Sequence, residues 1–272
     1  MLDSLAPVLR RDRVVVGVTL AVVVVLSWAY VVTGGGTGTP ASQMSGLPTA
    51  LHGNDPMGAM EPIRWTPGYA LLIFVMWWLM MLATMLPSAA PMILLFSALT
   101  RREHGSTAPY MGTGLFAGGY VAVWAGFSLL AVAFQWQLSR LALLSPMMVA
   151  TSTALGAILL LAAGIWQFTP LKHVCLRHCR APAEFLTHHW RNGRGGAVQM
   201  GILHGIYCLG CCWMLMLLLF FGGIMNIYWI AGLTTLVFVE KLAPFGKWVT
   251  GLVGAAFILS GGLLFVHLAR PS

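Results

Sequence analysis

The chain has 272 residues, of which 58% are hydrophobic and only 8% are charged, with a formal net charge of +8. A soluble domain carries about 25% charged residues, so this composition excludes an ordinary soluble globular protein. The sequence predicts an integral membrane protein. Its excess positive charge is explained by membrane orientation and anionic lipid, without any nucleic-acid partner.

Seven apolar runs of about 18 residues or more are each long enough to cross a bilayer as a helix. None of them shows the alternating pattern of membrane β-barrel strands. We therefore expect an all-α fold, a polytopic transmembrane helical bundle of about seven helices. The runs are residues 14–32, 69–97, 111–135, 147–168, 197–221, 225–242 and 249–268.

The first run follows the basic segment RRDR and resembles a signal sequence. Its core of about 19 residues is longer than that of a cleaved signal, so we expect a retained anchor helix. The chain then divides into two parts. Residues 1–68 form the N-terminal anchor helix and an outer loop, and residues 69–272 form a six-helix metal-binding membrane domain, a single compact bundle.

Basic residues predict the orientation, because cytoplasmic loops carry an excess of Lys and Arg. With a cytoplasmic N-terminus, only Arg64, Arg140 and Arg270 of the 15 basic residues lie outside. The expected location is a bacterial inner membrane, crossed several times, with the C-terminus outside. The lipid bilayer is the first expected partner.

The fifth run contains the strongest functional pattern, MGILHGIYCLGCC. At about 100° per residue, Met200, His204, Cys208 and Cys211 share one helical face, and Cys212 lies at its edge. Polar groups are costly within a bilayer, and imidazole, thiolate and thioether are ligands of copper(I) or zinc. The pattern predicts an intramembrane metal site. The alternative is that small cysteines only pack a helix interface.

Two other runs reach a similar depth and could complete this site. Met81 and Met85 share a face of the second run and offer thioether sulfur, although methionine is also an ordinary filler of apolar interiors. Glu240, the only acidic residue within a run, lies at a level close to His204. Its alternative is an interfacial ion pair with the adjacent Lys241.

A second cysteine pair lies in the predicted cytoplasmic loop LKHVCLRHCRAP. Cys175 and Cys179 are flanked there by His173 and His178, which favours a cytoplasmic metal dock. The alternative is a basic turn along the membrane surface with incidental thiols. None of the five cysteines is expected outside, so the sequence predicts reduced thiols and no disulfide framework.

These residues indicate a protein that binds or transfers copper(I), with zinc as the alternative metal. Thiolate with thioether suits copper(I), whereas zinc would suit two cysteines and a histidine with Glu240 or Cys212 as fourth ligand. A copper chaperone or a cuproenzyme is a candidate partner. Two other functions stay open: a copper-dependent membrane oxidoreductase using the same residues, and a structural or assembly subunit of a membrane complex. No catalytic residue is assigned.

The chain resembles a bacterial family of predicted metal-binding integral membrane proteins with no assigned function. The resemblance covers Trp65 to Gly246 in the blocks MWWLMMLATMLPSAAP, TPLKHVCLRHCRAP, GILHGIYCLGCCWMLM, GGIMNIYW and VEKLAPFG. It implies a multi-helix inner-membrane protein with a metal site, without naming the metal or a reaction. The family's characteristic blocks include Met81, Met85, Cys175, Cys179, His204, Cys208, Cys211, Cys212, Asn226 and Glu240.

Overall fold

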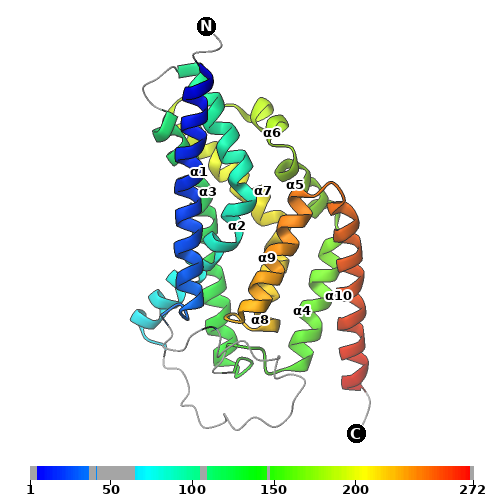
Figure 1. Cartoon of the computed structure of the whole chain (residues 1–272). Coiled ribbons are helices and arrows are strands. Elements are labelled where there is room, and N and C mark those ends of the chain that lie inside the picture. Colours follow the sequence, from blue (N-terminus) through cyan, green and yellow to red (C-terminus); the bar gives the residue numbers. More distant parts are fainter. Residues whose placement is uncertain (1–4, 37–40, 42–64, 105–108, 146–147, 270–272) are drawn as a thin grey trace.

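The computed structural model describes residues 5–36, 41, 65–104, 109–145 and 148–269. These residues are helical apart from turns, short connections and one isolated bridge (Figure 1). The all-α prediction is confirmed for them. The helices are α1 (Leu5–Val32), α2 (Pro67–His104), α3 (Pro109–Arg140), α4 (Thr153–Gln167), α5 (Pro170–Arg180), α6 (Pro182–His189), α7 (Gly193–Leu217), α8 (Leu219–Gly222), α9 (Ile227–Leu242) and α10 (Gly246–Ala269).

Within the described residues, five helices are long and apolar enough to cross a membrane: α1, α2, α3, α7 and α10. The expected number was about seven, and the two remaining runs form shorter helices. α4 has 15 residues and α9 has 16. At about 1.5 Å per residue they reach about 24 Å, less than the hydrocarbon thickness of about 30 Å.

α4 passes the same test only together with α5, and the two are bent by 64°. Pro170 at the start of α5 lacks the N–H that would continue the helix, and the hydroxyl of Thr169 caps the new helix by accepting from the Lys172 N–H. The segment LKHVCLRHCRAP, expected as a cytoplasmic loop, therefore forms nearly all of the short helix α5 and the first residue of a second one, α6.

A proline in α2 explains how α1 docks. Pro87 has no N–H for the carbonyl of Ala83, one turn earlier. The indole of Trp28 on α1 donates to that free carbonyl at 3.1 Å. Near one end of both helices, Arg101 forms a buried ion pair with Asp12. Both contacts join α1 to α2.

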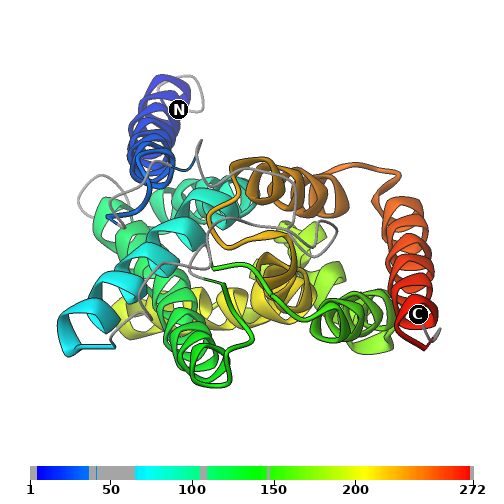
Figure 2. The same cartoon turned by 90° about the horizontal axis from the view of Figure 1, so that it is seen from below.

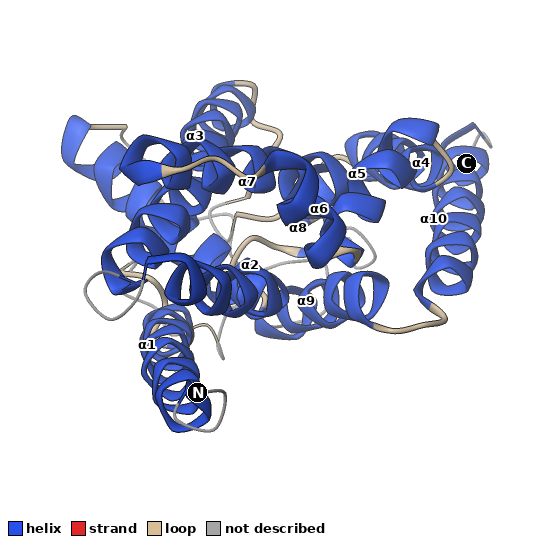
Figure 3. Cartoon of the chain, turned by 90° about the horizontal axis from the view of Figure 1, so that it is seen from above, coloured by secondary structure: helices blue, strands red, loops and turns tan. Residues whose placement is uncertain are grey.

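Viewed along the bundle, the helices form two rows, α3–α7–α5–α4 and α2–α9, with α1 and α10 at opposite edges (Figures 2 and 3). α3 and α7 approach closely because a glycine of α7 lies against the backbone of α3 where the two helices cross. A Cβ atom at Gly201 would lie 2.0 Å from the carbonyl oxygen of Phe116. This arrangement places α7 in the middle of the first row, opposite α2 and α9.

Candidate metal centre

α7 directs its predicted metal-binding face into the protein. Met200, His204, Cys208, Cys211 and Cys212 are each at most 2% exposed. The helix can bury this face because its neighbouring glycines allow α3 to approach. The polar side chains of the face therefore find their partners within the bundle.

Cys208 is the most highly connected of these residues. Its sulfur accepts a hydrogen bond from the Lys241 ammonium group of α9 at 2.9 Å and lies 3.1 Å from the Tyr120 hydroxyl of α3. The Lys241 ammonium group also donates to the Ser88 hydroxyl at 3.2 Å. Three neighbouring helices, α2, α3 and α9, thus meet α7 at this thiol.

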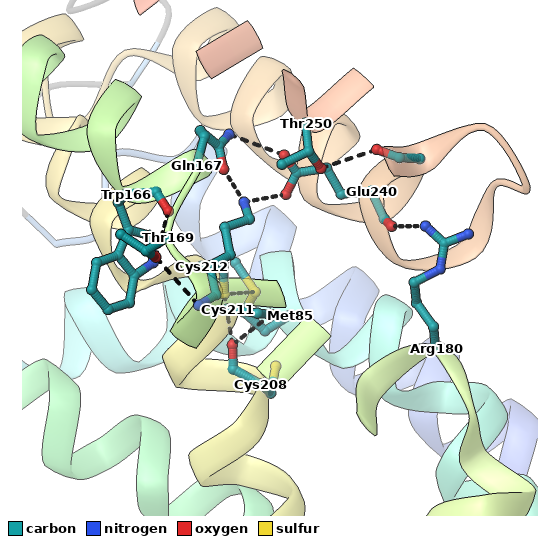
Figure 4. A network of polar contacts seen from close by, with 12 residues as sticks. Met85, Trp166, Gln167, Thr169, Arg180, Cys208, Cys211, Cys212, Glu240 and Thr250 are labelled. Atoms are coloured by element: carbon teal, nitrogen blue, oxygen red, sulfur yellow. Dashed lines mark hydrogen bonds and ion pairs between the residues drawn. The ribbon is translucent and has the colours of Figure 1, made fainter. Parts of the chain in front are cut away.

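Cys211 and Cys212 share one hydrogen-bond acceptor. Both thiols donate to the backbone carbonyl of Cys208, at 3.1 and 3.0 Å (Figure 4). The Cys212 sulfur also lies 3.8 Å from the sulfur of Met85 on α2. The structure thus brings Met85 to the cysteines of α7. Met81 is fully buried and lies one turn earlier in α2.

The two cysteines of α5 join the same region. The Cys179 side chain interacts with the side chains of Cys208 and Cys211. Cys175 packs behind them, so that a Cβ atom at Gly210 would lie 2.7 Å from its sulfur. The sequence treated α5 as a separate metal dock, but the structure joins Cys179 to the cysteines of α7.

His204 lies beside this cluster within a shell of aromatic rings. Its ring stacks on Tyr120 with centroids 5.6 Å apart and meets Phe185 edge-on at 5.5 Å. The Nδ1 atom is buried and has no hydrogen-bond partner in the described part of the chain. An unpaired buried nitrogen costs free energy, so this atom is available to a ligand.

Glu240 lies apart from the thiols. Its carboxylate accepts from the Lys172 ammonium group at 2.7 Å and from the Gln167 amide at 3.0 Å (Figure 4). All three side chains are at most 2% exposed. The structure therefore places Glu240 in a network of its own rather than with His204. The alternative pair with Lys241 does not form either, because adjacent helical side chains point about 100° apart.

The donor chemistry of the cluster fits a soft metal, but its thiols are not arranged around one point. Among the described residues, no group of three or more His, Cys, Asp or Glu side chains is already arranged to hold a metal ion. Two thiols are directed toward a carbonyl, and an ammonium group contacts the third. Side-chain rotation and loss of the thiol protons would be needed before these sulfurs could converge.

Sequence reasoning missed Lys241, Tyr120 and Ser88 as neighbours of the thiols. The sequence could have indicated Lys241, because consecutive residues of a helix point in different directions. If Glu240 faces one polar cluster, Lys241 must therefore face another region. Ser88 also carried a signal, because it shares the helical face of Met81 and Met85, whereas Tyr120 carried none, since its role depends on which helices pack together. Both are buried or nearly so and contact Cys208 or Lys241 directly.

Fold and site together define a helical, largely apolar protein with a buried centre of soft donors. A family model described as PpoB2, copper chaperone, matches residues 74–264, well over half of the chain. The chain therefore belongs to the PpoB2 copper chaperone family. No curated protein and no solved structure matches the chain. The matched range includes every residue predicted to bind metal. The family description names copper, whereas the resemblance implied only a metal.

Proposed function

We propose that this chain is a multi-pass membrane protein that holds copper(I) among its buried thiols and transfers it to a partner protein. Family membership supports a copper-related role. The apolar surface supports the membrane, because only 17% of the candidate span is buried in α1 and likewise in α10. Such a surface suits lipid rather than water.

One observation carries the proposal: four thiols from two helices lie together beside a methionine sulfur. Cys179 of α5 contacts the cysteines of α7, and Met85 lies against Cys212. Thiolate and thioether sulfur select copper(I), whereas zinc binds thioether poorly. We therefore prefer copper(I) to zinc.

The proposed ligand set is Cys179, Cys208, Cys211, Cys212 and Met85, with the unpaired Nδ1 atom of His204 as an auxiliary donor. Each thiol that binds copper loses its proton and leaves its present acceptor. Copper(I) with two or more thiolates carries net negative charge, which is costly in an apolar interior. The ammonium group of Lys241, 2.9 Å from Cys208, offsets that charge.

The proposed location is a bacterial inner membrane with the N-terminus in the cytoplasm and the C-terminus outside. α1 begins at the end of the bundle where α5 and α6 lie, and α10 ends at the other (Figure 1). A reporter enzyme fused after Ser272 should be active only outside the cytoplasm. Activity of a cytoplasmic reporter at that position would contradict the orientation.

The direct test is copper binding by the purified chain after replacement of two proposed ligands. Cys208→Ser with Cys211→Ser should remove the thiolate-bound copper, because serine keeps the size but loses the soft donor. Cys175→Ser is the matched control, since this buried thiol packs against Gly210 of α7 and lies outside the proposed ligand set. Thiolate-bound copper unchanged by the double substitution would overturn the proposed centre.

A further inference from the structure

A pocket of about 250 Å³ opens between α5 and α6. Its lining includes three histidines, His178 of α5 and His188 and His189 of α6. Arg177 and Glu184 also line it, so the charges of its wall balance.

Backbone contacts set the tautomer of all three imidazoles. The Nδ1 atoms of His178, His188 and His189 lie 2.9, 2.8 and 3.0 Å from carbonyl oxygens one turn earlier. A carbonyl only accepts, so each Nδ1 carries the proton and each neutral ring keeps its lone pair on Nε2. A backbone carbonyl bound to the other ring nitrogen is the usual support of a metal-binding histidine.

Two of these rings are also held in place by aromatic neighbours. The His178 ring stacks on Tyr207 at 4.1 Å with an angle of 2° between the planes. The His189 ring stacks on Phe185 at 4.9 Å. The two imidazole centroids are 6.2 Å apart. Two metal–nitrogen bonds of about 2.0 Å, with about 1 Å from each nitrogen to its ring centre, span about 6 Å.

The pocket is joined to the thiol cluster through adjacent residues. His178 precedes Cys179, whose thiol contacts Cys208 and Cys211. Tyr207, on which His178 stacks, precedes Cys208 in α7. Phe185 contacts the rings of both His189 and His204. A metal ion held in the pocket therefore lies at the level of Cys179 along α5, on the neighbouring face of the helix.

We propose that His178 and His189 form a second, two-nitrogen copper(I) site that receives the ion from the aqueous side and passes it to Cys179. This site serves the copper chaperone function proposed above and rests on it. Copper(I) accepts two ligands, and imidazole is one of its common donors. Transfer exchanges imidazole nitrogen for thiolate sulfur, one thiol proton is released to water, and the copper stays in the +1 state.

The test compares copper(I) binding by the full chain with that of His178→Phe and His189→Phe combined. Phenylalanine keeps the stacking on Tyr207 and Phe185 but has no Nε2. The double variant should bind one copper fewer per chain and should form its copper–thiolate absorption at least tenfold more slowly. His173→Phe, on an exposed residue of α5 outside this pocket, is the control and should match the parent.

A second variant separates this site from the thiol centre. The chain with Cys208→Ser and Cys211→Ser should keep the histidine-bound copper, with nitrogen neighbours only. Parent stoichiometry and parent loading rate in the His178→Phe, His189→Phe chain would overturn the histidine site. A chain that binds copper at the histidines but shows no copper–thiolate absorption would contradict the thiol centre instead.

Discussion

Glu240 and Lys241 are neighbours in α9, both are buried, and they belong to different polar clusters. Glu240 meets a full ion pair with Lys172 and an amide from Gln167, so its charge is balanced within the protein. Lys241 donates instead to the Cys208 thiol and the Ser88 hydroxyl. In the first cluster a positive and a negative charge are paired, whereas the second holds a positive charge beside thiols that carry negative charge when they bind metal.

The difference separates a structural network from a binding centre. A buried ion pair with its hydrogen bonds satisfied needs no ligand, and breaking it leaves an uncompensated charge. A buried cation beside thiols has its counter-charge when those thiols ionise. The two clusters should therefore respond differently to mutation, one in folding and the other in copper affinity.

The largest effect is expected from Glu240→Ala. Loss of the carboxylate leaves Lys172 buried without its partner, which should cost about 3–5 kcal/mol of stability. We expect a sharply lower yield and thermal midpoint in detergent, with normal copper per folded chain. Glu184→Ala, at an exposed residue, is the control and should leave stability unchanged. Full stability of Glu240→Ala would contradict the structural role of this network.

Lys241→Met should show the opposite behaviour. The substitution removes a buried charge, so the apo protein should be as stable as the parent or more stable. Copper(I) affinity should fall about 30-fold, a loss of about 2 kcal/mol, because the copper–thiolate charge loses its neighbour. Competition with a copper(I) chelator measures this loss. Exposed Lys247→Met is the control, and equal affinity in the two variants would remove Lys241 from the centre.

Met85→Leu should have a smaller effect, limited to the metal. Copper(I) affinity should fall about tenfold because one thioether is lost, while stability should change by less than about 1.5 kcal/mol. Met81→Leu, one turn away in the same helix, is the matched control and should leave affinity within threefold of the parent. Equal losses in both variants would show that both methionines act as ligands or that neither does.

Tyr120→Phe should give the smallest change. The Tyr120 hydroxyl donates to the carbonyl of Met85 at 3.2 Å and contacts the Cys208 sulfur. Loss of one hydrogen bond should lower stability by about 1 kcal/mol and change copper affinity by less than threefold. Thermal unfolding and chelator competition measure the two effects. A large loss of copper would place this hydroxyl in the centre itself.

The local hydropathy pattern of the sequence predicted the long apolar helices. Apolar runs located every long helix, and helical spacing identified the buried face that carries His204, Cys208 and Cys211. Boundaries were less accurate, because Pro170 starts a separate helix after α4 and because α9 is only 16 residues long. Helix boundaries depend on bends and caps, which hydropathy does not record.

Long-range pairing could not be derived from the sequence. Depth left Glu240 at the level of His204, so the sequence allowed either a place in the metal site or an ion pair with Lys241. The bend between α4 and α5 brings Lys172 to the carboxylate instead. The same bend carries Cys179 to the thiols of α7. Met85 belongs to the proposed ligand set because its sulfur lies near that of Cys212. Met81, on the same helical face, lies one turn away.

The most direct test of the central claim is X-ray absorption at the copper edge on the full chain loaded with less than one equivalent of copper(I). The first copper should go to the thiol centre, because thiolates bind copper(I) more tightly than imidazole. The spectrum should then show sulfur neighbours at about 2.3 Å, a distance typical of metal–thiolate bonds. A spectrum with only nitrogen or oxygen neighbours at about 2.0 Å would contradict a copper centre built on the cysteines of α5 and α7.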